Sequence, residues 1–135
     1  MKKANLAYVV EDDRITAVIT KVVVAKQLHY RTVQTFRNGH LAFEQLKAAV
    51  QTGSHVPDLI LLDLNMPVMD GWEFLAACDR LPLPPEVDVF ILTSSIRPED
   101  REKATHYKEV NGYFSKPLDE ANVQRMQVLL QQANA

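Results

Sequence analysis

Carboxylate side chains are grouped at two places in the sequence, and their spacing could support a divalent-cation site. Glu11, Asp12 and Asp13 are consecutive, and Asp63 directly follows the aliphatic residues 59–62. Crowded carboxylates repel one another unless a cation neutralises them, and oxygen atoms are the ligands that Mg²⁺ prefers. Helix capping would explain one of the consecutive acids, because Asp is a good N-cap residue. Three acids are more than a cap needs, which favours a cation site.

Each acidic group follows a short apolar run, which is typical of a strand buried on both faces. Residues 6–10 precede the three acids, and residues 59–62 precede Asp63. Ligands of open α/β sheets bind beyond the carboxyl ends of the strands, so both groups stand where chemistry is expected. A nucleotide or flavin site would need a glycine-rich or hydroxyl-rich first turn. The first turn here is acidic, which disfavours a bare phosphate.

Strand and helix patterns alternate five times along the chain, which predicts an α/β fold with a parallel sheet and helices on both faces. The predicted strands span residues 6–10, 32–36, 59–62, 87–92 and 112–115. The predicted helices span residues 14–28, 41–50, 72–81, 98–107 and, after a cap at Asp119, 120–130. The first of these helices shows an aliphatic stripe made of Ile15, Val18, Ile19, Val22 and Val23.

Two further strands end on polar residues that could join the acids. Thr93 follows the fourth predicted strand, and Lys116 follows the fifth. Each has an ordinary explanation, since a threonine can end a strand and a lysine can be a solvated charge. Because the carboxyl ends of parallel strands meet at one edge of a sheet, all of these residues are expected to lie together. Their agreement favours a functional site over accident.

Taken in order, these residues resemble the receiver domain of two-component response regulators. The matching positions are Glu11-Asp12, Asp63 with Met66-Pro67 and Asp70-Gly71, Thr93, and Lys116-Pro117. The resemblance covers residues 6 to about 130. It implies a flavodoxin-like, doubly wound five-stranded sheet of order 2-1-3-4-5. It also implies one receiver domain over residues 1–135, with a core of about 5–131 and no output domain.

The resemblance implies a role for each matching residue. Asp63 corresponds to the phosphoacceptor, Asp12 to a direct ligand of Mg²⁺ (or Mn²⁺), and Glu11 to an acid that acts through water. The backbone carbonyl of Asn65 corresponds to a further metal ligand. The remaining matches are Thr93 as the hydroxyl residue, Lys116 as the lysine and Tyr113 as the aromatic switch residue. Asp13 leaves open which two of the three consecutive acids face the metal.

The implied function is a phosphorylation switch, not an enzyme with a separate substrate. A sensor histidine kinase or phosphotransfer protein would donate the phosphoryl group, and hydrolysis would reset the switch. The output would pass through helix 98–107, strand 112–115 and the last helix to an unknown downstream protein. The chain would act as a monomer or as a phosphorylation-dependent dimer.

Two alternatives are weaker. A non-phosphorylated pseudo-receiver that serves only for docking would lack an acid, the acceptor or the lysine, and none is missing. A haloacid-dehalogenase-type phosphatase would need a second Asp two residues after Asp63, where Asn65 stands.

Composition sets the remaining expectations. The chain has 135 residues, 47% hydrophobic and 24% charged, which is ordinary for one globular domain. A net charge of -2 gives no electrostatic footprint for nucleic acid, so direct DNA binding is not expected. The single Cys78 excludes a disulfide framework, and the four histidines lack metal-ligand spacing. The first apolar run is too short for a signal peptide or a membrane span, so a cytoplasmic location is expected.

Overall fold

The computed structural model describes residues 6–133, so the predicted core boundary at residue 5 lies outside the described part of the chain. Five parallel strands form one sheet in the order β2-β1-β3-β4-β5, which confirms the predicted flavodoxin-like topology. The strands are β1 (Leu6–Val10), β2 (Thr32–Phe36), β3 (Leu59–Leu62), β4 (Asp88–Thr93) and β5 (Val110–Ser115). Because every pair is parallel, all five carboxyl ends lie at one edge of the sheet.

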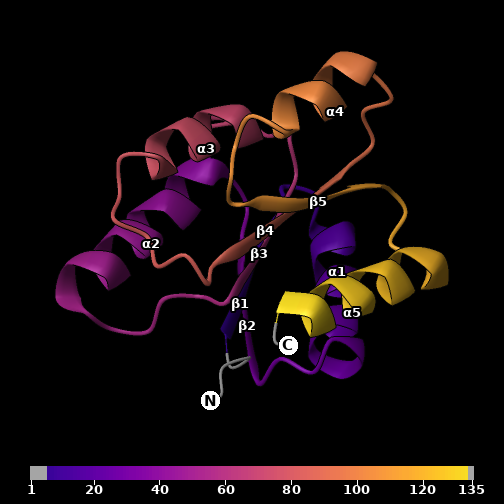
Figure 1. Cartoon of the computed structure of the whole chain (residues 1–135), viewed down its shortest axis with the longest axis horizontal. Coiled ribbons are helices and arrows are strands. Elements are labelled where there is room, and N and C mark those ends of the chain that lie inside the picture. The colour runs from indigo at the N-terminus through magenta and orange to yellow at the C-terminus, as the bar shows by residue number, and fades with distance from the viewer. Residues whose placement is uncertain (1–5, 134–135) are drawn as a thin grey trace.

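Five helices alternate with the strands and cover both faces of the sheet. They are α1 (Arg14–Gln27), α2 (Gly39–Thr52), α3 (Gly71–Cys78), α4 (Pro98–Ala104) and α5 (Glu120–Ala133). Helices α1 and α5 lie on one face, and α2, α3 and α4 lie on the other (Figure 1). Among the residues described, no helix is both long and apolar enough to cross a membrane.

The two hydrophobic cores are made by alternate residues of the same strands. In β1, Tyr8 and Val10 point toward α2 and α3, whereas Ala7 and Val9 point toward α1 and α5. All four are buried. Successive side chains of a strand point to opposite faces, so a strand covered on both faces needs apolar residues throughout. This explains why the central strands read as unbroken aliphatic runs.

Helix ends differ from the prediction where side chains provide local caps. Helix α2, predicted over residues 41–50, begins at Gly39, because the side-chain oxygen of Asn38 accepts a hydrogen bond from the N–H of Leu41 at 2.8 Å. Helices α3 and α4 each end three residues earlier than predicted. At the end of α4 the hydroxyl of Thr105 donates to the carbonyl of Glu102 at 2.6 Å. Strand β5 begins two residues earlier than predicted.

Most of the aliphatic stripe on α1 faces away from the core. Ile15, Val18, Ile19 and Val22 are between 48% and 72% exposed, whereas Val23 packs against the core. The buried residues of α1 are Ala17, Thr20 and Val24, which lie on another side of the helix. The stripe therefore predicted the helix correctly but left its outer face unexplained.

Val68 occupies a backbone conformation that a β-branched residue rarely adopts. It lies in the loop between β3 and α3 with a φ of 71°, and its side chain is 77% exposed. The N–H of Met69 donates to the carbonyl of Pro67 at 2.7 Å, which closes a tight turn around Val68. The carbonyl of Met69 accepts a hydrogen bond from the N–H of Gly39 at 3.0 Å. The turn thus joins this loop to the start of α2 at a cost in backbone strain.

Replacing Val68 with glycine should raise the free energy of unfolding by about 1 kcal/mol, because glycine removes the steric cost of positive φ. Urea denaturation of Val68→Gly against wild type measures the change. The matched control is Val22→Gly on the exposed face of α1, which should lose roughly 0.5 kcal/mol through helix propensity. A loss of stability in both variants would contradict strain at Val68.

Candidate functional site

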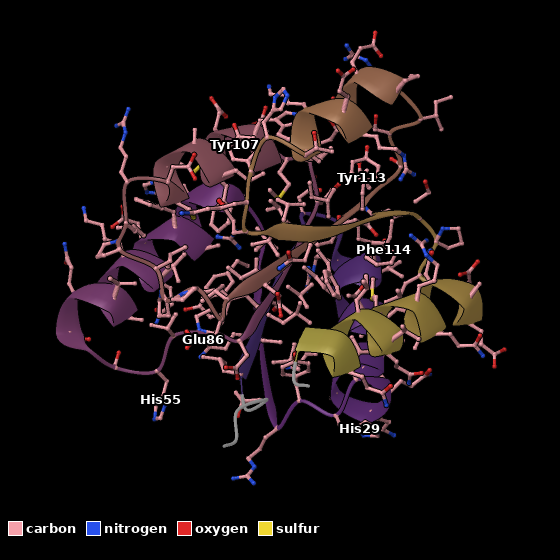
Figure 2. The ribbon with its side chains drawn as sticks, in the orientation of Figure 1. His29, His55, Glu86, Tyr107, Tyr113 and Phe114 are labelled. Carbon is pink, nitrogen blue, oxygen red and sulfur yellow. The ribbon has the colours of Figure 1, made fainter. Side chains whose placement is uncertain are left out.

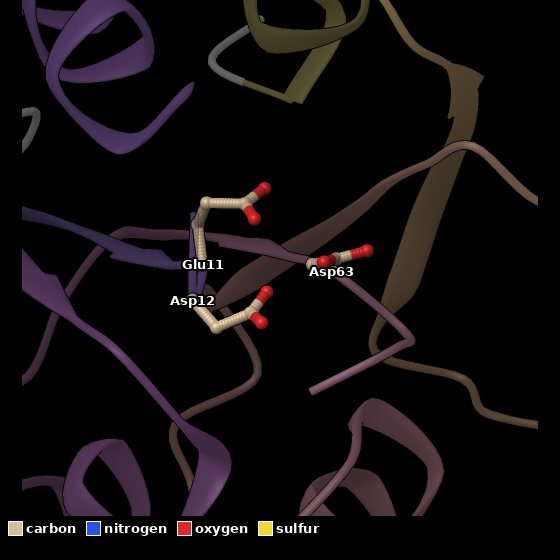
Figure 3. Close-up of side chains that lie close together, drawn as sticks. All are labelled: Glu11, Asp12 and Asp63. Atoms are coloured by element: carbon tan, nitrogen blue, oxygen red, sulfur yellow. The ribbon is translucent and has the colours of Figure 1, made fainter. Parts of the chain in front are cut away.

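Three carboxylates meet at the carboxyl edge of the sheet. Oxygen atoms of Glu11, Asp12 and Asp63 all lie within 4.8 Å of one another, and Figure 3 shows the three side chains around a common space. They meet because β1 and β3 are adjacent, with Val10 paired to Leu62. The N–H of Asp63 also donates to the carbonyl of Val10 at 3.0 Å, which continues the ladder beyond the last paired residues.

Glu11 is held on its backbone and at both side-chain oxygens. Its N–H donates to the carbonyl of Phe36 at 2.8 Å, so the end of β2 fixes its backbone. Its Oε2 accepts the N–H of Asp13 at 3.1 Å, and its Oε1 accepts Nζ of Lys116 at 2.6 Å. Glu11 and Asp63 are buried, whereas Asp12 is exposed. One side of the cluster is therefore open to solvent.

Asp13 has a different task from its two neighbours. Its Oδ2 accepts hydrogen bonds from the N–H of Thr16 at 2.8 Å and from the Thr16 hydroxyl at 2.5 Å. These hydrogen bonds, the hydroxyl one first, lower the pKa of the Asp13 carboxyl. Asp13 is thus the N-cap of α1. The acids that gather with Asp63 are Glu11 and Asp12, which resolves the ambiguity left by the sequence.

Among the residues that the structure describes, Lys116 is the one cation paired with the two buried carboxylates. Its Nζ lies 2.6 Å from Oε1 of Glu11 and 3.5 Å from Oδ2 of Asp63. Its backbone N–H donates to the carbonyl of Thr93 at 2.8 Å, which fixes the end of β5 against the end of β4. The predicted meeting of Asp63, Lys116 and the acids at one edge is therefore observed.

The electrostatics of the site favour an added cation. Burial is the largest effect on both Glu11 and Asp63 and raises the pKa of each carboxyl, while Lys116 opposes the rise. Burial by itself would lower the pKa of Lys116, but the hydrogen bond and charges of the two acids outweigh burial and raise it. Three carboxylates face one ammonium group, which leaves an excess of negative charge. An oxygen-only donor set with one solvent-exposed member suits a Mg²⁺ ion that keeps several waters.

Asn65, on the loop after β3, and Thr93, the last residue of β4, border the cluster. The N–H of Asn65 approaches Oδ1 of Asp63 at 3.4 Å, so this loop turns back toward the Asp63 carboxylate. Thr93 is fully buried, and its hydroxyl oxygen accepts the N–H of Ser95 at 3.2 Å. The hydroxyl of Ser95 in turn donates to Asp100 of α4 at 2.5 Å. Thr93 is therefore hydrogen-bonded to Ser95, the residue whose side chain contacts α4.

Tyr113, which the resemblance matches to the aromatic switch residue, has its ring inside the protein. It is only 9% exposed and belongs to the core beneath α4. The guanidinium of Arg101 lies 4.7 Å from the ring centroid. Figure 2 shows Tyr113 and its neighbour Phe114 on opposite sides of β5, Tyr113 toward α4 and Phe114 toward α5. Alternation along a strand explains this arrangement.

Comparison with known proteins identifies the family. A family model described as the response regulator receiver domain matches residues 7–127. The chain belongs to this receiver domain family.

Known receivers share both sequence and structure with this receiver. Response regulator Rcp1 of Synechocystis is 32% identical over 109 residues, which make up 79% of this chain and 73% of Rcp1. The Mn²⁺-bound form of Rcp1 superposes with a TM-score of 0.70 at 28% identity, covering 93% of this chain and 91% of that chain. A two-component response regulator from Cytophaga hutchinsonii gives a TM-score of 0.78 at 28% identity, covering 98% of both chains. The phosphorylated cyanobacterial phytochrome response regulator RcpA gives 0.73 at 26% identity, covering 98% of this chain and 96% of that chain.

The receiver should lose stability when Lys116 is replaced by methionine. Two buried carboxylates would then lack their cation, which should cost about 2 kcal/mol in metal-free buffer. Thermal unfolding and urea denaturation measure the loss, with Lys26→Met on the exposed end of α1 as the control. Adding Asp63→Asn to Lys116→Met should restore part of the stability, since it removes one of the two buried carboxylates that have lost their cation. Equal stability of Lys116→Met and Lys26→Met would show that the ion pairs contribute nothing.

Proposed function

We propose that this receiver accepts a phosphoryl group on Asp63 from the phosphohistidine of a sensor histidine kinase or a phosphotransfer protein. The supporting observation is the position of the Asp63 carboxylate, buried at the strand edge with two acids within 4.8 Å and Nζ of Lys116 at 3.5 Å. An Asp63 oxygen forms the new P–O bond as the P–N bond to histidine breaks, and the leaving imidazole keeps the electron pair. Water later cleaves the acyl phosphate. The receiver thus catalyses only its own phosphorylation and dephosphorylation.

The acid cluster would hold Mg²⁺, or Mn²⁺ as in the Rcp1 structure. Glu11, Asp12, Asp63 and the backbone carbonyl of Asn65 are the proposed protein ligands, with Glu11 acting through water. When bound, the ion neutralises carboxylate charge and stabilises charge on the phosphoryl oxygens. This role agrees with the excess of negative charge that Lys116 alone leaves.

Positioning by this chain's own groups accounts for the rest of the proposed chemistry. Phosphoryl transfer passes through a loose transition state whose charge is spread over three oxygens. Lys116, already held by Glu11, offers its ammonium to one of these oxygens. The Thr93 hydroxyl is proposed to turn from the Ser95 N–H and donate to another. The assembled set disfavours a pseudo-receiver, and Asn65 in place of a second Asp disfavours a dehalogenase-type phosphatase.

Asp63→Asn should fold but take up no phosphoryl group from acetyl phosphate and Mg²⁺, because an amide cannot form the acyl phosphate. Intact mass, followed by peptide mapping, detects a single added phosphoryl group in wild type. Asp13→Asn is the matched control, since asparagine caps helices as well as aspartate does, and it should be phosphorylated like wild type. Phosphate found on Asp63→Asn, or lost from Asp13→Asn, would move the acceptor or the metal role to another acid.

The proposed switch runs from Thr93 through α4. A phosphoryl group on Asp63 draws the Thr93 hydroxyl away from the N–H of Ser95, whose own hydroxyl holds Asp100 of α4. One charge-assisted hydrogen bond contributes roughly 1.5–3 kcal/mol, enough to shift an equilibrium on the order of ten- to a hundredfold. Tyr113, beneath α4, is proposed to change its contact with Arg101 as that helix moves. The surface of α4, β5 and α5 is then altered for a downstream partner.

Thr93→Ala should uncouple this switch, because alanine cannot follow the phosphoryl group. Trp72 is a natural probe, since its ring stacks on Tyr107 and lies 4.6 Å from Nζ of Lys103 in α4. Beryllofluoride with Mg²⁺ should change Trp72 fluorescence and the amide NMR shifts of α4 in wild type. Thr93→Ala should bind the mimic but show a much smaller change, as should Tyr113→Ala. Thr105→Ala, at the far end of α4, is the control. Equal responses in all four proteins would disprove coupling through Thr93 and Tyr113.

The exposed stripe on α1 is the proposed docking face for the phosphodonor. Ile15, Val18, Ile19 and Val22 follow directly after the acid cluster and its cap, so a protein bound there lies beside Asp63. A contiguous exposed aliphatic face commonly marks a protein interface. The spacing of these residues matches one side of a helix and suits contact with a partner helix.

Ile19→Asp should therefore slow phosphotransfer from a histidine kinase by at least tenfold while leaving phosphorylation by acetyl phosphate unchanged. Burial of a carboxylate at an interface costs more than the roughly 1.4 kcal/mol that a factor of ten represents. Val128→Asp places the same charge on the exposed face of α5 and serves as the control. Loss of transfer from both donor types would indicate damage to the fold, and loss from neither would exclude the α1 face as the docking site.

A further inference from the structure

Strand β2 is an edge strand without the features that usually protect such an edge. It pairs only with β1, through five consecutive residue pairs and no bulge. Its sequence, Thr32–Phe36, contains no charged residue, proline or glycine. Natural sheets commonly block edge strands with lysine, proline, bulges or a covering segment. Figure 1 shows β2 at the outer side of β1, between the helices of the two faces.

The outward hydrogen-bonding groups of β2 belong to Val33 and Thr35. In a parallel ladder the N–H and C=O of one residue point to the same side, and those of the next residue point to the other. The carbonyl of Phe36 accepts the N–H of Glu11 on β1, so Phe36 and the residues at even positions face inward. The N–H and C=O groups of Val33 and Thr35 are therefore directed away from the sheet.

A groove runs along this edge and leaves it uncovered. One part encloses about 980 Å³ between α1 and α2, and a second part of about 400 Å³ continues along β2. Both parts share Lys21, Thr35, Phe36 and Gln45, so they form one path along the strand. Five residues of extended chain span about 16 Å. The groove thus offers room and unused backbone groups for one more strand.

Positive charges stand at both ends of β2, although the charges that line the groove as a whole are balanced. Arg14, Lys21 and Arg37 line it together with the acids Glu11, Asp12 and Glu44. All three cations are exposed. Arg31 precedes β2 and Arg37 follows it, so both ends of the open strand carry a positive charge. An occupant with carboxylates at its ends matches this pattern.

A second copy of the chain fits the pattern poorly. If two β2 strands paired antiparallel along their whole length, Arg31 of each copy would face Arg37 of the other. Like charges directly opposite one another destabilise strand pairs. We propose that the β2 edge binds an extended, acidic segment of a partner protein, which adds a sixth strand through the backbone of Val33 and Thr35. The groove shares Val18 with the α1 stripe, but the proposed contacts are made by the backbone of β2 and by Arg31 and Arg37.

The probe is a synthetic peptide of alternating valine and threonine with glutamate at each end, acetylated and amidated. NMR titration of the ¹⁵N-labelled protein should show saturable shifts along β2, and hydrogen exchange of the Val33 and Thr35 amides should slow. The amide of Gln34, already directed to β1, should be unchanged. The same peptide with lysine at each end should bind about tenfold more weakly. Added salt should reduce this difference in affinity between the two peptides.

Two variants test the contacts. Thr35→Pro removes one outward N–H, and proline is tolerated where an edge N–H faces solvent, so binding should fall about tenfold for one lost hydrogen bond. Arg37→Glu should reverse the preference between the two peptides, whereas Arg80→Glu, beyond the end of α3, should not. Equal binding of both peptides, or no shift at β2, would overturn the proposal. Concentration-dependent dimerisation of the chain alone with protection of Val33 and Thr35 would overturn it in favour of a second copy.

Discussion

The site depends on the contact between the ammonium group of Lys116 and the carboxylates of Glu11 and Asp63. Taking these carboxylates out of water is costly, and burial raises the pKa of both. The lysine offsets part of this cost, at 2.6 Å from Glu11 and 3.5 Å from Asp63. Because this one cation pairs with two of the three clustered acids, the cluster keeps an excess of negative charge, which the proposed metal ion would neutralise. The same contact therefore holds the two buried carboxylates in place and leaves part of the negative charge of the cluster unpaired.

The sheet supplies the precision that this contact needs. Glu11, Asp63 and Lys116 each stand one residue beyond a strand, and the backbone of each is bonded to the neighbouring strand. The N–H of Asp63 bonds to Val10, that of Glu11 to Phe36, and that of Lys116 to Thr93. Strand ends are rigid in a way that free loops are not, so the side chains can be held close despite their repulsion. The apolar residues of β1 and β3 thus influence the site because they set the register of the two strands, and the register decides where Glu11 and Asp63 stand.

Periodicity in the sequence predicted the parallel sheet and the meeting of the acids, Asp63 and Lys116 at one edge, whereas the strand order followed from the family resemblance. Buried parallel strands read as aliphatic runs, and their last residues must meet at one edge. What failed to follow from the sequence depends on packing between elements. The α1 stripe has the period of a core-facing stripe, yet the helix buries Ala17, Thr20 and Val24 and leaves most of the stripe exposed. Asp13 could be told from Glu11 and Asp12 only by its bonds to Thr16. The inward position of Tyr113 likewise depends on α4, whose place no local pattern specifies.

Helix α4 is weakly attached, as the proposed switch requires. It has seven residues, its N-cap Arg97 makes no side-chain capping bond, and Ala104 is its only buried residue. Two cation–π contacts, Arg101 on Tyr113 and Lys103 on Trp72, tie it to the body of the domain. Such contacts contribute about 0.5–1 kcal/mol each when exposed. Their sum is similar to the roughly 1.5–3 kcal/mol of a single charge-assisted hydrogen bond. A change at the Thr93 hydroxyl is therefore large enough to compete with the contacts that hold α4, whereas it is far too small to disturb the central strands buried on both faces.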